Sequence, residues 1–218
     1  MMRRILGVAL TGVLLPAAVS AQGFGVGARA GTLGIGGEIA VAASSSLTIR
    51  GGFGVLPVEF SRTYSDVDYT SEPTSPIANI GVDFFPGGGN LRIGAGMLFL
   101  SEPTTLGGEY TGTVNIGGQT YTGSQVGTLT GELDHGSSAP YAIVGFGRHT
   151  GRGVGVFLDL GAAFMKDPTL TLTATGPIAS DPTFQANLER EEAEAQEAAQ
   201  DYLKILPIVS VGVRIGIR

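Results

Sequence analysis

The charged residues that offer chemistry in this sequence are isolated ones, set among glycines and aliphatic residues. Seven of them lie in segments where every second residue is apolar: Arg29, Glu38, Arg50, Asp83, Arg92, Asp159 and Arg214. Four are cations and three are anions, so their charges nearly balance. An ion removed from water is costly unless it pairs. We therefore predict that these seven side chains point into one interior and form a connected network.

Two functions are compatible with such an interior network. Pairing across a narrow lumen would fill it and make a structural plug. The same residues could instead line a polar conduction path or gate. Both interpretations require the charges to point inward, so alternation does not separate them. We also expect Tyr141 to lie near Asp159.

The two histidines are the remaining candidates for catalysis. A hydrolytic site needs a serine, a histidine and an acid within hydrogen-bond reach. His135 follows Asp134 and precedes Ser137 and Ser138, which is also typical of a polar loop, and His149 falls in an expected turn. We predict no catalytic residue and no enzyme activity, and keep a lipid-modifying enzyme as a third interpretation.

Cofactors, metals and nucleic acid find no support in the sequence. The chain has no Cys, and its Gly-x-Gly patterns lie in strand-like segments without the following helix that phosphate binding requires. No acidic segment has the spacing of a calcium loop, and the net charge of −6 argues against nucleic acid. We interpret one acidic set as a solvated helix face: Glu189, Glu191, Glu192, Glu194, Glu197 and Asp201.

Eight segments with period-two alternation would position the seven charges. They are 24–30, 33–41, 47–55, 79–84, 91–99, 139–147, 153–164 and 205–218. One face is aliphatic and the other is mostly glycine; for 139–147 we assign Ala142, Val144 and Phe146 to the aliphatic face. Glycine weakens strands, and a narrow closed lumen gives a reason to accept that cost. The fold class is thus all-β, an eight-stranded antiparallel transmembrane β-barrel.

Aromatic residues at the ends of the aliphatic faces fit the two girdles of a membrane barrel. At one end they are Phe24, Phe84 and Phe146, and at the other Phe53, Phe99 and Phe164. A soluble β protein is the main rival. However, its outer face would be polar, whereas this chain has a mean hydropathy of +0.25 with 36 glycines.

The connections alternate in length along the chain. Three are short (44–46, 86–89 and 148–152), and three are long loops (56–75, 101–138 and 166–204). A four-residue connection at 86–89 predicts that Asp83 faces Arg92 and that Phe84 faces Leu91. Asp181 as N-cap and Pro182 at the first position predict one short acidic helix in the last long loop.

The first residues have the pattern of a cleaved signal peptide. Arg3 and Arg4 precede a short apolar run, and Val19-Ser20-Ala21 offers the small residues of a cleavage site. We expect residues 1–21 to be the signal and residues 22–218 to be the barrel. No later segment approaches the length of an apolar membrane helix.

Several short motifs resemble a known group of proteins. They are Gln119-Thr120-Tyr121-Thr122, Val126-Gly127-Thr128-Leu129-Thr130-Gly131, Ala139-Pro140-Tyr141, Gly145-Phe146-Gly147 and the stretch 206–213. With them the chain resembles the small outer-membrane β-barrel proteins of Gram-negative bacteria, which include OmpA-like and OmpW-like barrels. The likeness is greatest to an uncharacterised set of these barrels.

We expect the protein to be a monomer in the bacterial outer membrane, in line with its signal peptide and its lipid-compatible strand faces. Its partners would be outer-membrane lipid, lipopolysaccharide and the barrel assembly machinery. Its role would be structural or a surface interaction, with a narrow channel for a small hydrophobic or polar solute as the alternative. Such barrels usually end in an aromatic residue, whereas this sequence ends in Ile217-Arg218.

Overall fold

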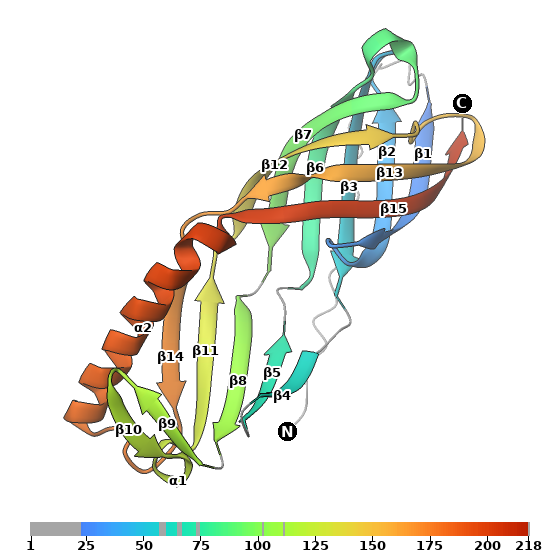
Figure 1. The fold of residues 1–218 in the computed structure, drawn as a ribbon. Helices are drawn as coiled ribbons and strands as arrows, with labels where there is room; N and C mark the ends of the chain where they lie inside the picture. The colour runs from blue at the N-terminus through green and yellow to red at the C-terminus, as the bar shows by residue number, and fades with distance from the viewer. Residues whose placement is uncertain are drawn as a thin grey trace.

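Eight antiparallel strands close into a barrel (Figure 1). The computed structural model describes residues 23–56, 60–64, 67–72, 75–101, 103–110 and 112–217, and the predicted signal peptide 1–21 lies outside them. The strands follow the order β1-β15-β13-β12-β7-β6-β3-β2 around the barrel. They are β1 (Phe24–Gly31), β2 (Ile35–Ala42), β3 (Leu47–Val55), β6 (Ile77–Phe84), β7 (Leu91–Leu100), β12 (Ser138–Phe146), β13 (Gly153–Phe164) and β15 (Ile205–Ile217). The predicted all-β, eight-stranded barrel is confirmed.

The two faces of the barrel wall follow the predicted alternation, with one exception. Val144 and Phe146 on β12 are more than half exposed, which confirms their assignment to the outer face. Leu33 was expected outside but is buried. It lies in the β1–β2 turn, where Gly34 adopts a positive φ of 87° and donates its N–H to the Gly31 carbonyl. The turn interrupts the alternation and directs Leu33 inward.

The register predicted between β6 and β7 is wrong by two residues. Phe84 pairs with Ile93 and Asp83 with Gly94, not with Leu91 and Arg92. The connection is longer than expected because it contains a 3₁₀ turn, η1 (Pro86–Gly88), and because Leu91 and Arg92 pair with β12 and not with β6. A shift of two residues keeps each side chain on its face. Asp83 and Arg92 therefore both point into the lumen despite the error.

The three predicted long loops contain a second sheet. Its strands are β4 (Phe60–Tyr64), β5 (Val67–Glu72), β8 (Thr104–Tyr110), β11 (Thr128–Asp134) and β14 (Thr169–Ala174), in the order β14-β11-β8-β5-β4. This order repeats that of the barrel strands β13, β12, β7, β6 and β3, and each strand of the second sheet directly follows or precedes its barrel counterpart in the chain (Figure 1). Five adjacent barrel strands are thus prolonged into an open sheet.

Helix α2 (Pro182–Leu203) packs against this sheet. Together with the hairpin β9 (Thr113–Ile116) and β10 (Gln119–Thr122) and the helical turn α1 (Gly123–Val126), they form what we call the extension. The carboxylate of Asp181 accepts hydrogen bonds from the Thr183 and Phe184 amides at 2.8 and 3.0 Å, as predicted for the N-cap. With 22 residues, the helix is longer than the short one expected.

The side chains of α2 serve both the core and an edge of the extension. Phe184 and Leu188 form a buried cluster with Ile116 and Val126. Glu192 and Gln196 accept hydrogen bonds from alternate amides of the edge strand β14, and so satisfy backbone groups that would otherwise invite pairing with another chain. No helix among the described residues is long and apolar enough to span a membrane.

Candidate functional site

The inward charges gather near the end of the barrel that carries the three short turns, which we call the turn end. Arg50 on β3 lies at their centre. Its Nε is 3.2 Å from Asp83 Oδ1, and its Nη1 is 3.3 Å from Asp159 Oδ2 and 3.8 Å from Glu38 Oε2. The four side chains are at most 3% exposed. One guanidinium therefore links carboxylates from strands β2, β6 and β13.

Arg92 on β7 forms a second bridge between two of the same carboxylates. Its Nε lies 3.4 Å from Asp83 Oδ2, and its Nη2 pairs with Asp159 Oδ1. Its Nη1 donates to the carbonyl of Gly147. The side chain of Arg92 is completely buried. Asp83 and Asp159 are thus each held between two arginines.

His149, which lies in the predicted turn 148–152, completes the group. The turn between β12 and β13 folds into the lumen and buries the imidazole. Its Nε2 is 2.5 Å from Glu38 Oε1 and its Nδ1 is 3.7 Å from Asp83 Oδ2. The ring packs on Phe157, with centroids 4.5 Å apart. We call the group the lumen ion cluster: Glu38, Arg50, Asp83, Arg92, His149 and Asp159.

Glycines in the barrel wall make room for this cluster. A Cβ on Gly145 would lie 2.6 Å from Asp159 Oδ1 and 2.7 Å from Arg92 Nε, closer than real contacts allow. A Cβ on Gly94 would collide with Asp83 Oδ1 in the same way. These glycines are therefore needed not only because the lumen is narrow, but also because the side chains of Asp83, Arg92 and Asp159 occupy the space next to them.

Two of the seven predicted residues lie outside the ion-pair network. Arg29 is 4% exposed, and its Nε and Nη2 are buried without a hydrogen-bond partner in the described part of the chain. Arg214 donates its Nη1 to the carbonyls of Gly151 and Gly153 in the β12–β13 turn. The structure brings the other five together: Glu38, Arg50, Asp83, Arg92 and Asp159.

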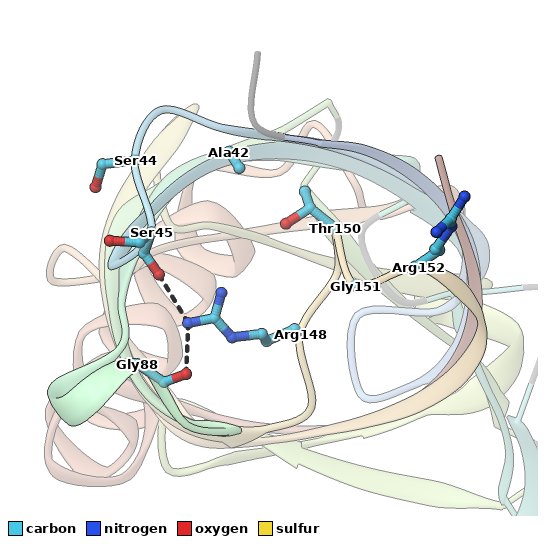
Figure 2. A pocket seen from close by; sticks show the side chains of 8 residues that line it. All are labelled: Ala42, Ser44, Ser45, Gly88, Arg148, Thr150, Gly151 and Arg152. Atoms are coloured by element: carbon cyan, nitrogen blue, oxygen red, sulfur yellow. Dashed lines mark hydrogen bonds between the residues drawn. The ribbon is translucent and has the colours of Figure 1, made fainter. Parts of the chain in front are cut away.

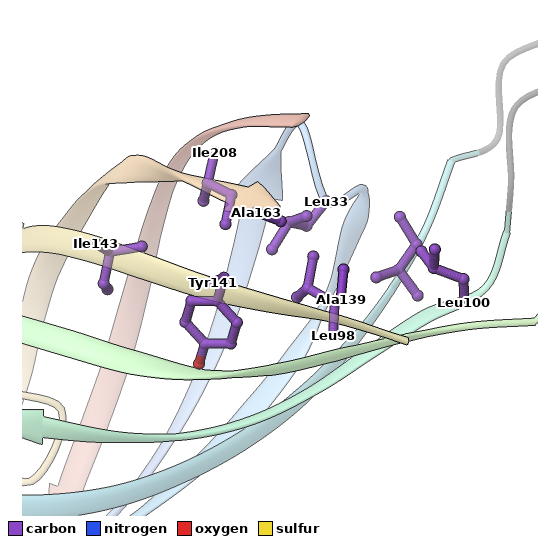
Figure 3. Packing of buried hydrophobic residues seen from close by; sticks show 9 residues of the cluster. Leu33, Leu98, Leu100, Ala139, Tyr141, Ile143, Ala163 and Ile208 are labelled. Carbon is purple, nitrogen blue, oxygen red and sulfur yellow. The ribbon is translucent and has the colours of Figure 1, made fainter. Parts of the chain in front are cut away.

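The lumen towards the extension is filled by apolar side chains (Figure 3). This apolar cluster consists of Leu33, Ile77, Leu98, Leu100, Ala139, Tyr141, Ile143, Ala163 and Ile208. Tyr141 joins it to the ion cluster, because the Cζ of Arg50 lies 5.9 Å from the centre of the tyrosine ring. Tyr141 and Asp159, which were expected to lie close together, both contact Arg50. The interior is thus packed with ions at one level and with apolar groups at the next.

Arg148 closes the turn end by joining the three short turns. It donates to the carbonyls of Ser45, Gly88 and Gly89 at 2.8 to 2.9 Å. Its guanidinium also lies 4.5 Å from the centre of the buried Phe85 ring. These contacts fix the β12–β13 turn, which carries His149 into the lumen.

His135, the other histidine, lies far from the cluster in the β11–β12 connection. Burial lowers its pKa, while nearby Asp134 and a backbone hydrogen bond with Lys166 act in the opposite direction. The Asp134 carboxylate itself accepts the Gly136 amide at 2.7 Å. Asp134, the acid beside the weak catalytic candidate His135, is therefore engaged in a local turn.

The acidic residues of α2 do more than face solvent. Glu191 accepts the amide of Gly117 at 2.9 Å, and Arg190 donates to the carbonyl of the same residue. With the Glu192 contact to β14, this ties the helix to both sheets of the extension. Among the described residues, no group of three or more His, Cys, Asp or Glu side chains is arranged to hold a metal ion.

Comparisons with known proteins agree on the fold. No protein-family model and no curated protein sequence matches the chain. Solved structures do match, and CarO and CarO2 of Acinetobacter baumannii are among them. CarO has 23% identity and a TM-score of 0.59, and the match covers 88% of this chain and 96% of that one. CarO2 has 22% identity and a TM-score of 0.61, and the match covers 89% and 98%. The expected likeness to OmpA-like or OmpW-like barrels stays a prediction. The chain shares its fold, a small closed barrel, with the CarO proteins.

Proposed function

We propose that this protein is an outer-membrane barrel whose lumen is closed and whose extension serves interactions at the cell surface. The packing of the lumen carries this proposal. At the ion level, Asp83 and Arg92 are 0% exposed, and at the apolar level Leu98, Ala139 and Ala163 are 0% exposed. This burial at two successive levels supports a closed lumen, so we favour the structural interpretation over the channel.

The outer surface supports a place in lipid. Its aliphatic side chains are largely exposed, among them Val154 at 78% and Ile215 at 60%. The six phenylalanines expected as girdles are all exposed as well: Phe24, Phe53, Phe84, Phe99, Phe146 and Phe164. Such a surface is stable in a bilayer and would aggregate in water. Within the closed barrel no strand edge is free for pairing, which fits a monomer, whereas the open sheet of the extension keeps an edge at β4.

The extension offers the surface through which partners would be met. Cross-strand partners on one of its faces are Thr130 with Thr173, Glu132 with Thr171, and Asp134 with Thr169. All but Thr130 are exposed. A face of hydroxyls and carboxylates suits polar partners, such as the sugar and cation-bridged phosphate groups of lipopolysaccharide.

The two lysines of the sequence allow a test of this arrangement. Both Lys166 and Lys204 lie where β13 and β15 meet the extension. We expect the protein to fractionate with outer membranes and a membrane-impermeant amine reagent to label it on intact cells. The variant with Lys166→Arg and Lys204→Arg is the matched control and should not be labelled. Recovery as a soluble periplasmic protein, or labelling only after cell lysis, would contradict the proposal.

A further inference from the structure

A cavity of about 270 Å³ opens at the turn end, on the outer side of the ion cluster (Figure 2). It is lined by Ala42, Ser44, Ser45, Gly88, Arg148, Thr150, Gly151 and Arg152. These residues come from all three short turns. The lining contains two arginines and no carboxylate, although the whole chain has a net charge of −6. We propose that this cavity binds a small oxyanion, of the carboxylate or phosphate class.

Arg148 is held in a position that suits this role. Its Nε and Nη2 are engaged by the carbonyls of Gly89, Ser45 and Gly88. Its Nη1 has no hydrogen-bond partner among the described residues, and Figure 2 shows this nitrogen on the side of the guanidinium that faces Thr150. A guanidinium fixed by three carbonyls keeps its remaining N–H groups oriented for an acceptor, so little ordering is needed when an anion binds.

Thr150 and Arg152 supply the rest of the site. Thr150 is 6% exposed, lines the cavity and makes no side-chain hydrogen bond within the described part of the chain, so its hydroxyl is available as a donor. Arg152 is exposed at the rim and adds a second positive charge. Two charges and a hydroxyl in one concave site match an oxyanion and disfavour a cation. The site does not depend on the role proposed for the extension.

His149 gives a direct readout, because it lies between Arg148 and Thr150 in the chain. The chain contains two histidines, so the variant His135→Gln leaves His149 as the only imidazole signal in an NMR spectrum. We would titrate the refolded full chain, in phosphate-free maltoside micelles, with acetate and then with inorganic phosphate. We expect a saturable shift of the His149 ring signals, absent when chloride is added to the same ionic strength.

Two variants and one control test the assignment of the site. Thr150→Val and Arg152→Gln should each weaken binding by about tenfold, since each removes a charge-assisted contact. Lys166→Gln removes a distant cation and should leave binding unchanged. Arg148 is left intact because it holds the turns together. A shift that is not saturable, or binding by both variants that is as tight as that of the wild-type protein, would overturn the proposal.

The source of the oxyanion is decided by repeating the titration in phosphatidylglycerol nanodiscs. A His149 shift that is already present before acetate is added would identify a lipid headgroup as the occupant. A shift that still requires acetate would identify a free anion. Either result supports the site, whereas loss of acetate binding without a prior shift would count against it.

Discussion

Replacing Asp83 by alanine should cost far more stability than the loss of a surface carboxylate. Asp83 is completely buried and lies 3.2 Å from Arg50, 3.4 Å from Arg92 and 3.7 Å from His149. Its removal leaves three basic groups with the carboxylates of Glu38 and Asp159 alone. Breaking a buried ion pair from one side costs about 3–5 kcal/mol, because a charge stays buried without its partner. We expect Asp83→Ala to lower the free energy of unfolding by about that amount.

The surface pair of Asp167 and Lys204 provides the matched control. Their charged atoms are 3.0 Å apart, but the side chains are 67% and 45% exposed. Water screens such a pair, so Asp167→Ala should cost about 0–1 kcal/mol. Urea unfolding of both variants in lipid vesicles, followed by circular dichroism, measures the difference. If the free energies of unfolding of Asp83→Ala and Asp167→Ala differ by less than about 1 kcal/mol, the buried ion pairs do not stabilise the barrel.

Three further predictions concern other parts of the molecule. Gly145→Ala should destabilise the barrel by about 1–3 kcal/mol through overpacking against Asp159, while Gly107→Ala, where a Cβ meets nothing within 4 Å, should not; urea unfolding of the pair would show the contrast. Asp181→Ala should weaken α2 by about 1 kcal/mol, seen as faster amide exchange in the helix with unchanged exchange in the barrel. The lowered pKa of His135 means that the folded state favours the neutral ring. The free energy of unfolding should therefore be highest above the unfolded-state pKa of His135 and should decrease as the pH falls below it. In His135→Gln, urea unfolding at a series of pH values should show that this part of the pH dependence has disappeared.

The barrel was predictable because its period-two pattern is strong and its turns are short. The alternation in β15 alone separates an aliphatic face from one of small and charged residues, and burial follows it residue by residue. The register at η1 was not predictable from loop length. Phe85 continues the inward alternation of β6 and is covered by Arg148, and the 3₁₀ turn that follows it is a local feature that loop length does not indicate.

The extension carried a signal that the sequence analysis did not use. Thr169-Leu170-Thr171-Leu172-Thr173-Ala174 alternates as regularly as a barrel strand, although the predicted long loop 166–204 includes it. His149 carried no such signal. Its place in the ion cluster arises because the β12–β13 turn folds into the lumen, and a turn residue shows no periodicity that predicts its direction.

Single-channel recording on the refolded protein in planar bilayers tests the closed lumen most directly. The packing of the ion cluster and the apolar cluster predicts that the wild-type protein shows no ohmic unit conductance at neutral pH. The apolar cluster fills a second level of the lumen next to the ions, so Asp83→Ala alone is expected to give at most brief openings. A stable, reproducible open state of the wild-type protein would contradict the account and make the channel the favoured function.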